Sequence, residues 1–354
     1  RQTGFRPLGM LIMAPTTRAQ DQGSWSWHPA TGRLVIESPP GTPLAELGGS
    51  WSIDALEKML EGLSRGRLGR VFATGDGPVR CPLRLSNGQD VHLVGMFTSE
   101  TEARGMLLTG EDFPEFDPVD LKPGPDLVPV YQPIISLRDG RVVGFEALAR
   151  WAGVGLSAPP SRWEDQALAS NMLIRAAETL ADLRREAKRD DLFMHVNLTA
   201  RELTKSTIPA LIEALTSSYG LPERAIRIEL TEQAALRDES KTLASAMALK
   251  AVGAGLVLDD FGTGHSSFAW LADLPFDSLK IDHGLTAKLG ETRTDTILST
   301  ITLLASRLGM STTAEGLEKR EDAARLRALG FDNAQGFAFS KGVDARAALA
   351  FLKG

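Results

Sequence analysis

The stretch LVLDDFGTG, Leu256–Gly264, joins an apolar run to two adjacent carboxylates and a turn with two glycines. The apolar run predicts a buried strand, and the glycines predict its exit into a loop. Asp259 and Asp260 repel each other at the strand end, so ionising both is costly unless a cation lies between them. An exposed Asp-Asp turn is the commoner meaning of this dipeptide. However, an apolar strand with a polar group at its carboxyl end recurs along the chain, which favours a site built from strand ends.

Residues 125–354 alternate between predicted strands and helices, a pattern typical of α/β domains. We expect eight strands, at Val130–Ile135, Val142–Leu148, Leu192–Leu198, Ala225–Leu230, Gly255–Leu258, Ser278–Ile281, Ser311–Ala314 and Gly336–Phe339. Between most of them we expect helices, at Leu168–Ala187, Ile208–Tyr219, Ser240–Val252, Thr294–Leu308 and Lys319–Leu329. Eight strands in roughly 230 residues favour a (β/α)₈ barrel of the TIM type.

The first two strands of this barrel should differ from the rest. Asp139-Gly140 between them predicts a tight turn, so the pair should run antiparallel. A doubly wound open sheet is the alternative architecture. It would need a phosphate-binding glycine signature after the first strand, and the sequence has none there.

Residues 23–112 predict a separate, small α+β domain. We expect a helix at Ile53–Ser64 and strands at Trp25-Ser26-Trp27, Arg33–Ile36, Arg80–Leu85, Val91–Thr98 and Ala103–Thr109. The W-x-W opening and the closing antiparallel strands resemble a PAS domain, which implies a sensory or pairing role. A dimerisation module without a ligand is the alternative. Residues 1–22 predict a linker or frayed terminus, and residues 113–124, rich in proline and acidic side chains, predict a second linker.

Composition bounds the class of protein. The 354 residues are 43% hydrophobic and 24% charged, as in an ordinary globular protein with room for two domains. A net charge of −6 does not indicate a basic surface for binding a nucleic-acid polymer or an anionic membrane. The single cysteine, Cys81, excludes an intrachain disulfide and fits a reducing, cytoplasmic compartment. No apolar run is long enough to predict a membrane segment.

Polar side chains end or follow the expected strands of the barrel. They are Glu146, Asn197, Glu229, Asp259, Asp260, Lys280, Glu315 and Gln335. Because functional groups of such barrels lie at the carboxyl ends of the strands, these side chains should meet in one mouth. An oxygen-rich pocket suits hard divalent cations, Mg²⁺ or Mn²⁺, rather than zinc or copper. Five carboxylates are more than one Mg²⁺ usually takes, so we expect two cations, an arrangement suited to attack of water on a phosphodiester.

Each of these residues alone has a purely structural interpretation. Asn197 could cap a helix, and Glu146 could pair with Arg150. Their convergence by position at strand ends favours the functional interpretation.

Glu146–Arg150, EALAR, resembles the signature of EAL domains, the cyclic di-GMP phosphodiesterases. Further motifs of that family follow in its order: Tyr131-Gln132-Pro133-Ile134, Val196-Asn197-Leu198, Glu229-Leu230-Thr231-Glu232, Asp259–Ser267 (DDFGTGHSS), Lys280-Ile281-Asp282, Ala314–Glu318 (AEGLE) and Gln335-Gly336-Phe337. The resemblance covers residues 125–354. It implies hydrolysis of cyclic di-GMP to linear pGpG in bacterial second-messenger signalling, with the N-terminal PAS-like domain as regulator.

The resemblance also implies a role for each matching residue. Glu146, Asn197, Glu229 and Asp259 would bind one cation, and Asp259 and Asp260 the second, with Mg²⁺ or Mn²⁺ active and Ca²⁺ inhibitory. Lys280 would hold the attacking water, Glu315 would act as general base or outer metal partner, and Glu232 would pin the DDFGTG loop and link it to a dimer interface. The expected substrate or water contacts are Gln132, Glu146, Leu148, Arg150, Asp282 and Gln335. A homodimer through the EAL domain, with the PAS-like domain as a second contact, is implied too.

The chain departs from the family pattern in three places. His265 stands where a tyrosine is usual, Gly342 replaces a proline, and Gly153–Asn171 lacks the usual motifs of that segment. The last departure keeps a second function in view, a cyclic di-GMP receptor that turns over little or no nucleotide and signals through a protein partner. A scaffold that ignores the nucleotide is a third. The Asp259-Asp260 pair argues against a scaffold, because carboxylate repulsion has no structural use.

Overall fold

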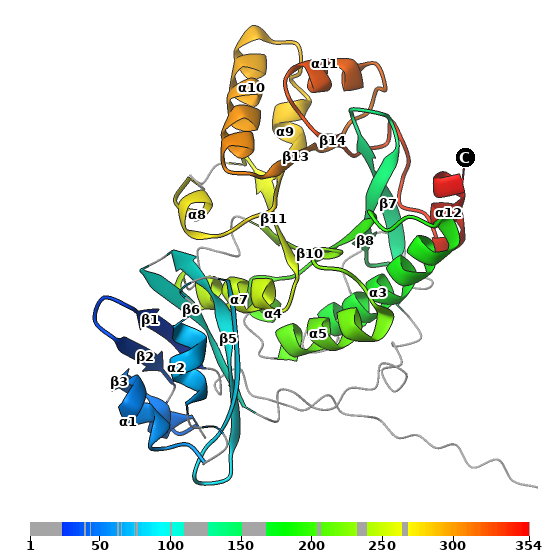
Figure 1. The fold of residues 1–354 in the computed structure, drawn as a ribbon. Helices are drawn as coiled ribbons and strands as arrows, with labels where there is room; N and C mark the ends of the chain where they lie inside the picture. The colour runs from blue at the N-terminus through cyan, green and yellow to red at the C-terminus, as the bar shows by residue number, and fades with distance from the viewer. Residues whose placement is uncertain are drawn as a thin grey trace, which may run out of the picture.

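The computed structural model describes residues 23–353, except 39, 43, 62–63, 65, 74, 76, 100, 110–126, 151–167, 204–206, 232–238 and 264–267. Within the described residues, a closed eight-stranded barrel stands beside a six-stranded antiparallel sheet (Figure 1). No helix among these residues is both long and apolar enough to cross a membrane.

The barrel is formed by β7 (Val130–Ser136), β8 (Val142–Leu148), β9 (Phe193–Asn197), β10 (Ile226–Thr231), β11 (Gly255–Phe261), β12 (Ser278–Ile281), β13 (Ser311–Ala314) and β14 (Asn333–Ala334). The strands close in the order β10-β11-β12-β13-β14-β7-β8-β9. Strand β7 runs antiparallel to both of its neighbours, β8 and β14, while the other neighbours are parallel. The TIM-like barrel and its antiparallel first pair are therefore confirmed. The turn at Asp139-Gly140 uses a positive φ of 72° at Gly140, which glycine adopts without steric cost.

The described helices around the barrel include the five that the sequence predicted, and others that it did not predict. They are α3 (Leu168–Ala187), α4 (Ala200–Leu203), α5 (Thr207–Tyr219), α7 (Glu239–Ala251), α8 (Phe268–Asp273), α9 (His283–Thr286), α10 (Thr292–Arg307), α11 (Asp322–Ala328) and α12 (Ala345–Lys353). Their apolar faces pack on the strands and build one large core.

The predicted eighth strand is wrong. We expected it at Gly336–Phe339, but the pairing strand is Asn333–Ala334, which joins β13 on one side and β7 on the other. This strand has only two residues and one of them is polar, so it carries no apolar pattern in the sequence. Gln335 follows it directly and therefore lies at the strand end after all.

The N-terminal region is a mixed α/β unit. It comprises β1 (Gly23–His28), β2 (Arg33–Glu37), the short 3₁₀ turn η1 (Ala45–Leu47), β3 (Gly49–Ser52), α1 (Ile53–Glu57), α2 (Arg67–Phe72), β4 (Pro78–Arg84), β5 (Asp90–Ser99) and β6 (Glu102–Thr109), with the sheet order β3-β2-β1-β6-β5-β4. The predicted helix Ile53–Ser64 ends at Glu57, because Leu60 forms a bridge with Leu85 instead. The PAS resemblance and the domain boundaries stay predictions, and the predicted linkers 1–22 and 113–124 lie entirely outside the described residues.

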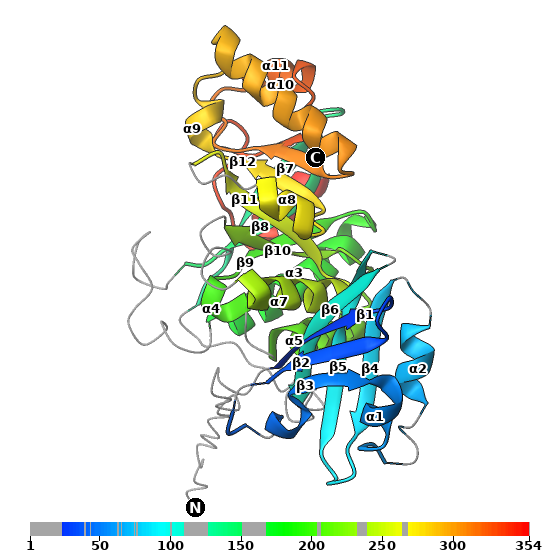
Figure 2. The same ribbon diagram turned by 90° about the vertical axis from the view of Figure 1, so that its left-hand side faces the viewer.

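The sheet is covered on both faces. On one face, Trp25 and Trp27 pack around Phe72 of α2, with ring centroids 5.6 and 4.8 Å away. On the other face, Val94, Met106 and Leu108 join the core of the barrel. Helix α7 lies between the sheet and the barrel strands (Figure 2). It therefore connects the N-terminal unit to β11, the strand that begins four residues after α7 ends.

Candidate active site

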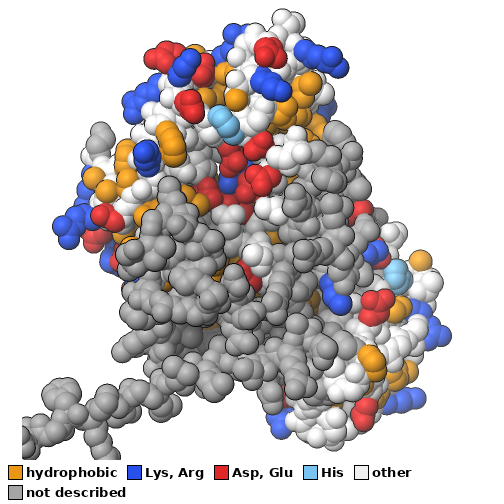
Figure 3. Space-filling model, turned by 180° about the vertical axis from the view of Figure 1, so that it is seen from behind, with side chains coloured by type: hydrophobic (Ala, Val, Ile, Leu, Met, Phe, Trp, Pro, Cys, Tyr) orange, Lys and Arg blue, Asp and Glu red, His pale blue; other side chains and the backbone are white. Residues whose placement is uncertain are grey.

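The carboxyl ends of the barrel strands enclose a cavity of about 440 Å³. Among the predicted residues, those that line it are Gln132, Glu146, Leu148, Asp259, Lys280, Glu315 and Gln335. Figure 3 shows acidic side chains gathered in the hollow on this face. Gln132 reaches the mouth because β7 runs antiparallel, which brings the start of this strand to the end where its neighbours finish, opposite Glu146.

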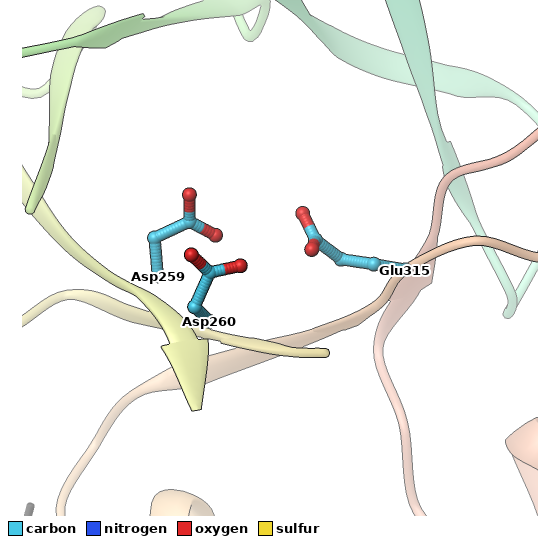
Figure 4. Close-up of side chains that lie close together, drawn as sticks. All are labelled: Asp259, Asp260 and Glu315. Atoms are coloured by element: carbon cyan, nitrogen blue, oxygen red, sulfur yellow. The ribbon is translucent and has the colours of Figure 1, made fainter. Parts of the chain in front are cut away.

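The side chains of Asp259 and Asp260 both lie at the mouth of the barrel because β11 is irregular there. Successive residues of a regular strand point to opposite faces, so only one of the two should face inward. Asp260, however, has a φ of 57°, and the pairing of β11 with β12 shifts between Leu258 and Phe261. Aspartate tolerates this left-handed conformation better than most residues. As a result, oxygens of Asp259, Asp260 and Glu315 all lie within 4.8 Å of one another (Figure 4).

Lys280 lies at the centre of the carboxylates, with its side chain 2% exposed. Its Nζ is 2.6 Å from Glu315, 2.7 Å from Glu229, 3.2 Å from Asp259 and 3.4 Å from Glu146. Burial lowers the pKa of Lys280, but the four carboxylates raise it more, so the net pKa lies well above its ordinary value and the ammonium is charged. Together with Asp260, five carboxyl groups surround one ammonium, an excess of acidic groups that divalent cations would offset.

Glu146 is held by three donors. Asn197 donates to its Oε1 at 2.9 Å, while Gln335 at 2.7 Å and Lys280 at 3.4 Å donate to its Oε2. The Gln335 amide is also 3.1 Å from the side-chain oxygen of Gln132. Burial raises the pKa of Glu146, but Lys280 and the two amides lower it more, so the net pKa falls below its ordinary value and the group is ionised.

Glu229 is the most deeply buried of the carboxylates, at 1% exposure. Burial and the neighbouring Glu146 raise its pKa well above the ordinary value. Its Oε2 has no hydrogen-bond partner, and neither has Asp259 Oδ1, which is near Lys280 but poorly aligned with it. Buried carboxylate oxygens without donors are rare in proteins, and they are the ligands that Mg²⁺ and Mn²⁺ prefer. The donor set therefore fits the predicted cations.

Glu315 and Asp260 also have raised pKa values. Burial raises the pKa of Glu315 to about 7, with Lys280 opposing the shift and Asp259 adding to it. For Asp260, burial and the adjacent Asp259 raise the pKa. Carboxyl groups with raised pKa values inside a cavity are candidates for proton transfer.

Two of the predicted site residues that the structure describes are not brought into this network, and a third cannot be placed. Arg150 does not line the cavity and donates to the backbone of Ala149 at 2.7 Å. Asp282 caps helix α9 by accepting from the backbone of Gly284 at 2.7 Å. Glu232 lies outside the described residues, as do His265 and most of the divergent segment 153–171.

Other lining residues received no role from the sequence. They are His283, Gly316, Glu318, Gly336 and Phe337. All of them lie within or next to motifs quoted above, so position in a motif was the available signal. Phe337 is 66% exposed, which is unusual for a large apolar side chain and places a flat ring at the rim of the cavity.

Known proteins share this barrel and its motifs. The family model of the EAL domain matches residues 122–342. The cyclic di-GMP phosphodiesterase RocR of Pseudomonas aeruginosa is 31% identical over 219 residues, a match that covers 60% of this chain and 56% of RocR. The chain therefore spans little more than half the length of that relative.

Solved structures give the same result. The EAL enzyme Bd1971 with cAMP and cyclic di-GMP bound superposes with a TM-score of 0.59 at 28% identity, over 64% of this chain and 65% of that chain. A complex of Klebsiella pneumoniae BlrP1 with manganese and cyclic di-GMP superposes with a TM-score of 0.52 at 25% identity, over 63% and 57% of the two chains.

Proposed function

The chain belongs to the EAL domain family, and from this premise we propose that it is a metal-dependent phosphodiesterase that hydrolyses cyclic di-GMP to linear pGpG. The proposal depends most on the excess of buried carboxylates around Lys280. Two of their oxygens, Glu229 Oε2 and Asp259 Oδ1, have no hydrogen-bond donor. The similarity to RocR, a cyclic di-GMP phosphodiesterase, the cyclic di-GMP bound in Bd1971, and the manganese and cyclic di-GMP bound in BlrP1 support the same assignment.

The cations would be held by the strand-end residues. Glu146, Asn197, Glu229 and Asp259 would hold one, and Asp259 with Asp260 the other. When bound, such ions lower the pKa of a water molecule and offset charge on the phosphoryl oxygens. A pocket with this donor set fits Mg²⁺ or Mn²⁺.

The protein's own groups would position the substrate and move the proton. Glu315 accepts a proton from the attacking water, a role that its pKa of about 7 suits near neutral pH. Lys280 donates to the water oxygen and holds it in line. The new bond joins this oxygen to phosphorus, and the bond from phosphorus to the ribose 3′ oxygen breaks. The 3′ oxygen leaves as a hydroxyl after taking up a proton from solvent, and Glu315 returns the proton of the attacking water to solvent. Gln335 keeps Glu146 oriented throughout.

The N-terminal unit would regulate this site through α7. Arg80 of β4 donates to the backbone of Ala251 at the end of α7 at 2.5 Å and pairs with Glu213 of α5 at 2.7 Å. A shift of the sheet would therefore move α7 and, through it, β11 and its two aspartates. This is the regulatory role that the PAS resemblance implies.

Arg80→Ala tests the coupling, with Arg84→Ala as the matched control. Arg84 lies on the same strand but pairs with Glu61 and Asp90, both within the N-terminal unit. We expect faster hydrogen exchange in α7 and a several-fold change of turnover in R80A alone. Equal exchange and equal turnover in the three proteins would exclude this coupling.

The homodimer that the resemblance implies is part of the proposal. Sedimentation of the protein with and without cyclic di-GMP checks it. A monomer in both conditions would contradict it.

One assay separates the enzyme from the alternatives, the receptor and the scaffold. Binding of cyclic di-GMP is measured in Ca²⁺, and its hydrolysis in Mg²⁺ and Mn²⁺, with EDTA as the control. The proposed enzyme binds in Ca²⁺ and forms pGpG in the other two ions. Binding without product would identify a receptor, and absence of both would identify a scaffold.

A further inference from the structure

His195 lies inside the barrel, below the mouth. It belongs to β9, is 1% exposed, and its Nδ1 is 2.7 Å from Oε1 of Glu229 on the neighbouring strand. Lys280 Nζ is 2.7 Å from the same Oε1. Two donors therefore converge on one oxygen of Glu229, while Oε2 has no partner.

The imidazole is fixed by a stack of side chains. Its ring lies 5.0 Å from the ring of Phe193 at an interplanar angle of 29°, and the Arg227 guanidinium lies 3.6 Å from the centre of the Phe193 ring. Two glycines on flanking strands make room for the stack. A Cβ at Gly144 would lie 2.5 Å from the Phe193 ring, and one at Gly255 would lie 2.8 Å from the Arg227 side chain. The backbones of β8 and β11 are thus shaped around side chains carried by β9 and β10.

The direction of the hydrogen bond follows from the role proposed for Glu229. A carboxylate that binds a cation is ionised and can only accept, so Nδ1 of His195, 2.7 Å from Oε1, would carry the hydrogen. Such a donor orients the carboxylate and leaves Oε2, which has no hydrogen-bond partner, to a cation.

We propose that His195 is a positioning residue for the metal centre: its Nδ1–H holds Oε1 of Glu229 so that Oε2 is presented to a cation. The inference rests on the proposed function in one respect, that Glu229 binds metal. Groups that hydrogen-bond to metal ligands in this way typically change metal affinity by about 10–100-fold when removed.

Binding of Mn²⁺ alone, followed by the electron paramagnetic resonance signal of the free ion, tests the proposal without nucleotide. His195→Leu removes the donor, and His195→Asn restores an N–H donor. Met194→Leu is the matched control, because Met194 is buried on the same strand and belongs to the apolar core. We expect H195L to bind Mn²⁺ about 10–100-fold more weakly, H195N to recover most of the affinity, and M194L to match the parent.

The proposal is overturned if H195L binds Mn²⁺ as tightly as the parent, or if H195N is as weak as H195L at equal melting temperature in EDTA. Should H195L not fold, His195→Phe keeps a ring against Phe193 without a donor, and the same loss is expected. A parent that binds no Mn²⁺ overturns the proposal as well. A parent that binds Mn²⁺ but forms no pGpG refutes only the proposed function, since the affinities of the variants still decide the role of His195.

Discussion

Among the described residues, Lys280 is the single positive charge in contact with the buried carboxylates, and we expect it to serve both stability and chemistry. Without cations it offsets part of the repulsion between Glu229, Glu315, Asp259 and Glu146. If cations bind as proposed, they would offset this repulsion instead, and the ammonium would be left to hold water. The two roles separate in a variant studied with and without metal.

Lys280→Ala should bind cyclic di-GMP almost normally in Ca²⁺ but lose about 10²–10⁴ in the rate of hydrolysis in Mn²⁺, because a group that acts at the transition state affects turnover more than binding. In EDTA the variant should melt at a lower temperature than the parent, and Mn²⁺ should restore most of the difference. Single-turnover rates and thermal melts check both. If K280A hydrolyses cyclic di-GMP at the parental rate, Lys280 has no role in the chemical step.

Glu315 gives the stability a pH dependence. Its pKa is raised to about 7, above the value of about 4.3 in an unfolded chain. Between these values the folded protein binds more protons than the unfolded chain, so this group lowers the free energy of unfolding as pH rises from about 4.3 to about 7. The free energy of unfolding is measured with urea in EDTA at about pH 5 and about pH 8. The difference between the two values should be smaller for Glu315→Gln than for the parent. Identical pH dependence would mean that the pKa is not raised.

At the scale of the element, the irregular end of β11 brings two adjacent carboxylates to the same mouth. The left-handed conformation of Asp260 costs most residues about 1–2 kcal/mol, but Asn tolerates it as Asp does. Burial and Asp259 also disfavour the Asp260 charge. The conformation and the charge can therefore be tested separately.

Asp260→Asn should be at least as stable as the parent in EDTA, and Asp260→Val should be about 1–2 kcal/mol less stable than D260N. Mn²⁺ should stabilise both variants less than the parent, because each lacks a ligand. Urea unfolding with and without Mn²⁺ measures these differences. Equal stability of D260N and D260V would argue against the left-handed conformation.

Sequence patterns predicted the elements that have length and an apolar stripe. Helix α3 was predicted at its observed bounds, and most of the strand ends that carry carboxylates were found. Short elements were missed or misplaced, since the two-residue β14 has no periodicity and α2 has only six residues. Both Asp259 and Asp260 were expected at the mouth, but the left-handed backbone of Asp260 that accompanies this was not predicted from the residue pattern.

The role of His195 was also beyond the sequence. It lies in a strand that is otherwise apolar up to Asn197, so the pattern identifies a buried position and nothing more. Its partner Glu229 is 34 residues away and is reached only through barrel closure. The packing of α7 against the N-terminal sheet could not be predicted either. A helix that is buried on two sides has no polar face, so its sequence does not indicate which side packs on which neighbour.

At the scale of the whole molecule, cation binding should couple to folding. A ligand that binds the folded state alone raises the free energy of unfolding, by about 2.7 kcal/mol at 100 times its dissociation constant. The melting temperature of the EDTA-treated protein should therefore rise with Mn²⁺ concentration. Asp259→Asn, which lacks the shared ligand, should respond much less. A melting temperature independent of Mn²⁺ in the parent would contradict a metal centre.

The most direct test of the account is a chromatographic assay of nucleotide products under single-turnover conditions. The protein is stripped with EDTA, mixed with cyclic di-GMP, and then supplied with Mn²⁺. We predict no product before the cation is added, conversion to pGpG afterwards, and no conversion by Asp259→Asn in either condition. Intact cyclic di-GMP after Mn²⁺ addition, with the nucleotide bound, would contradict the account, as would pGpG formed in EDTA.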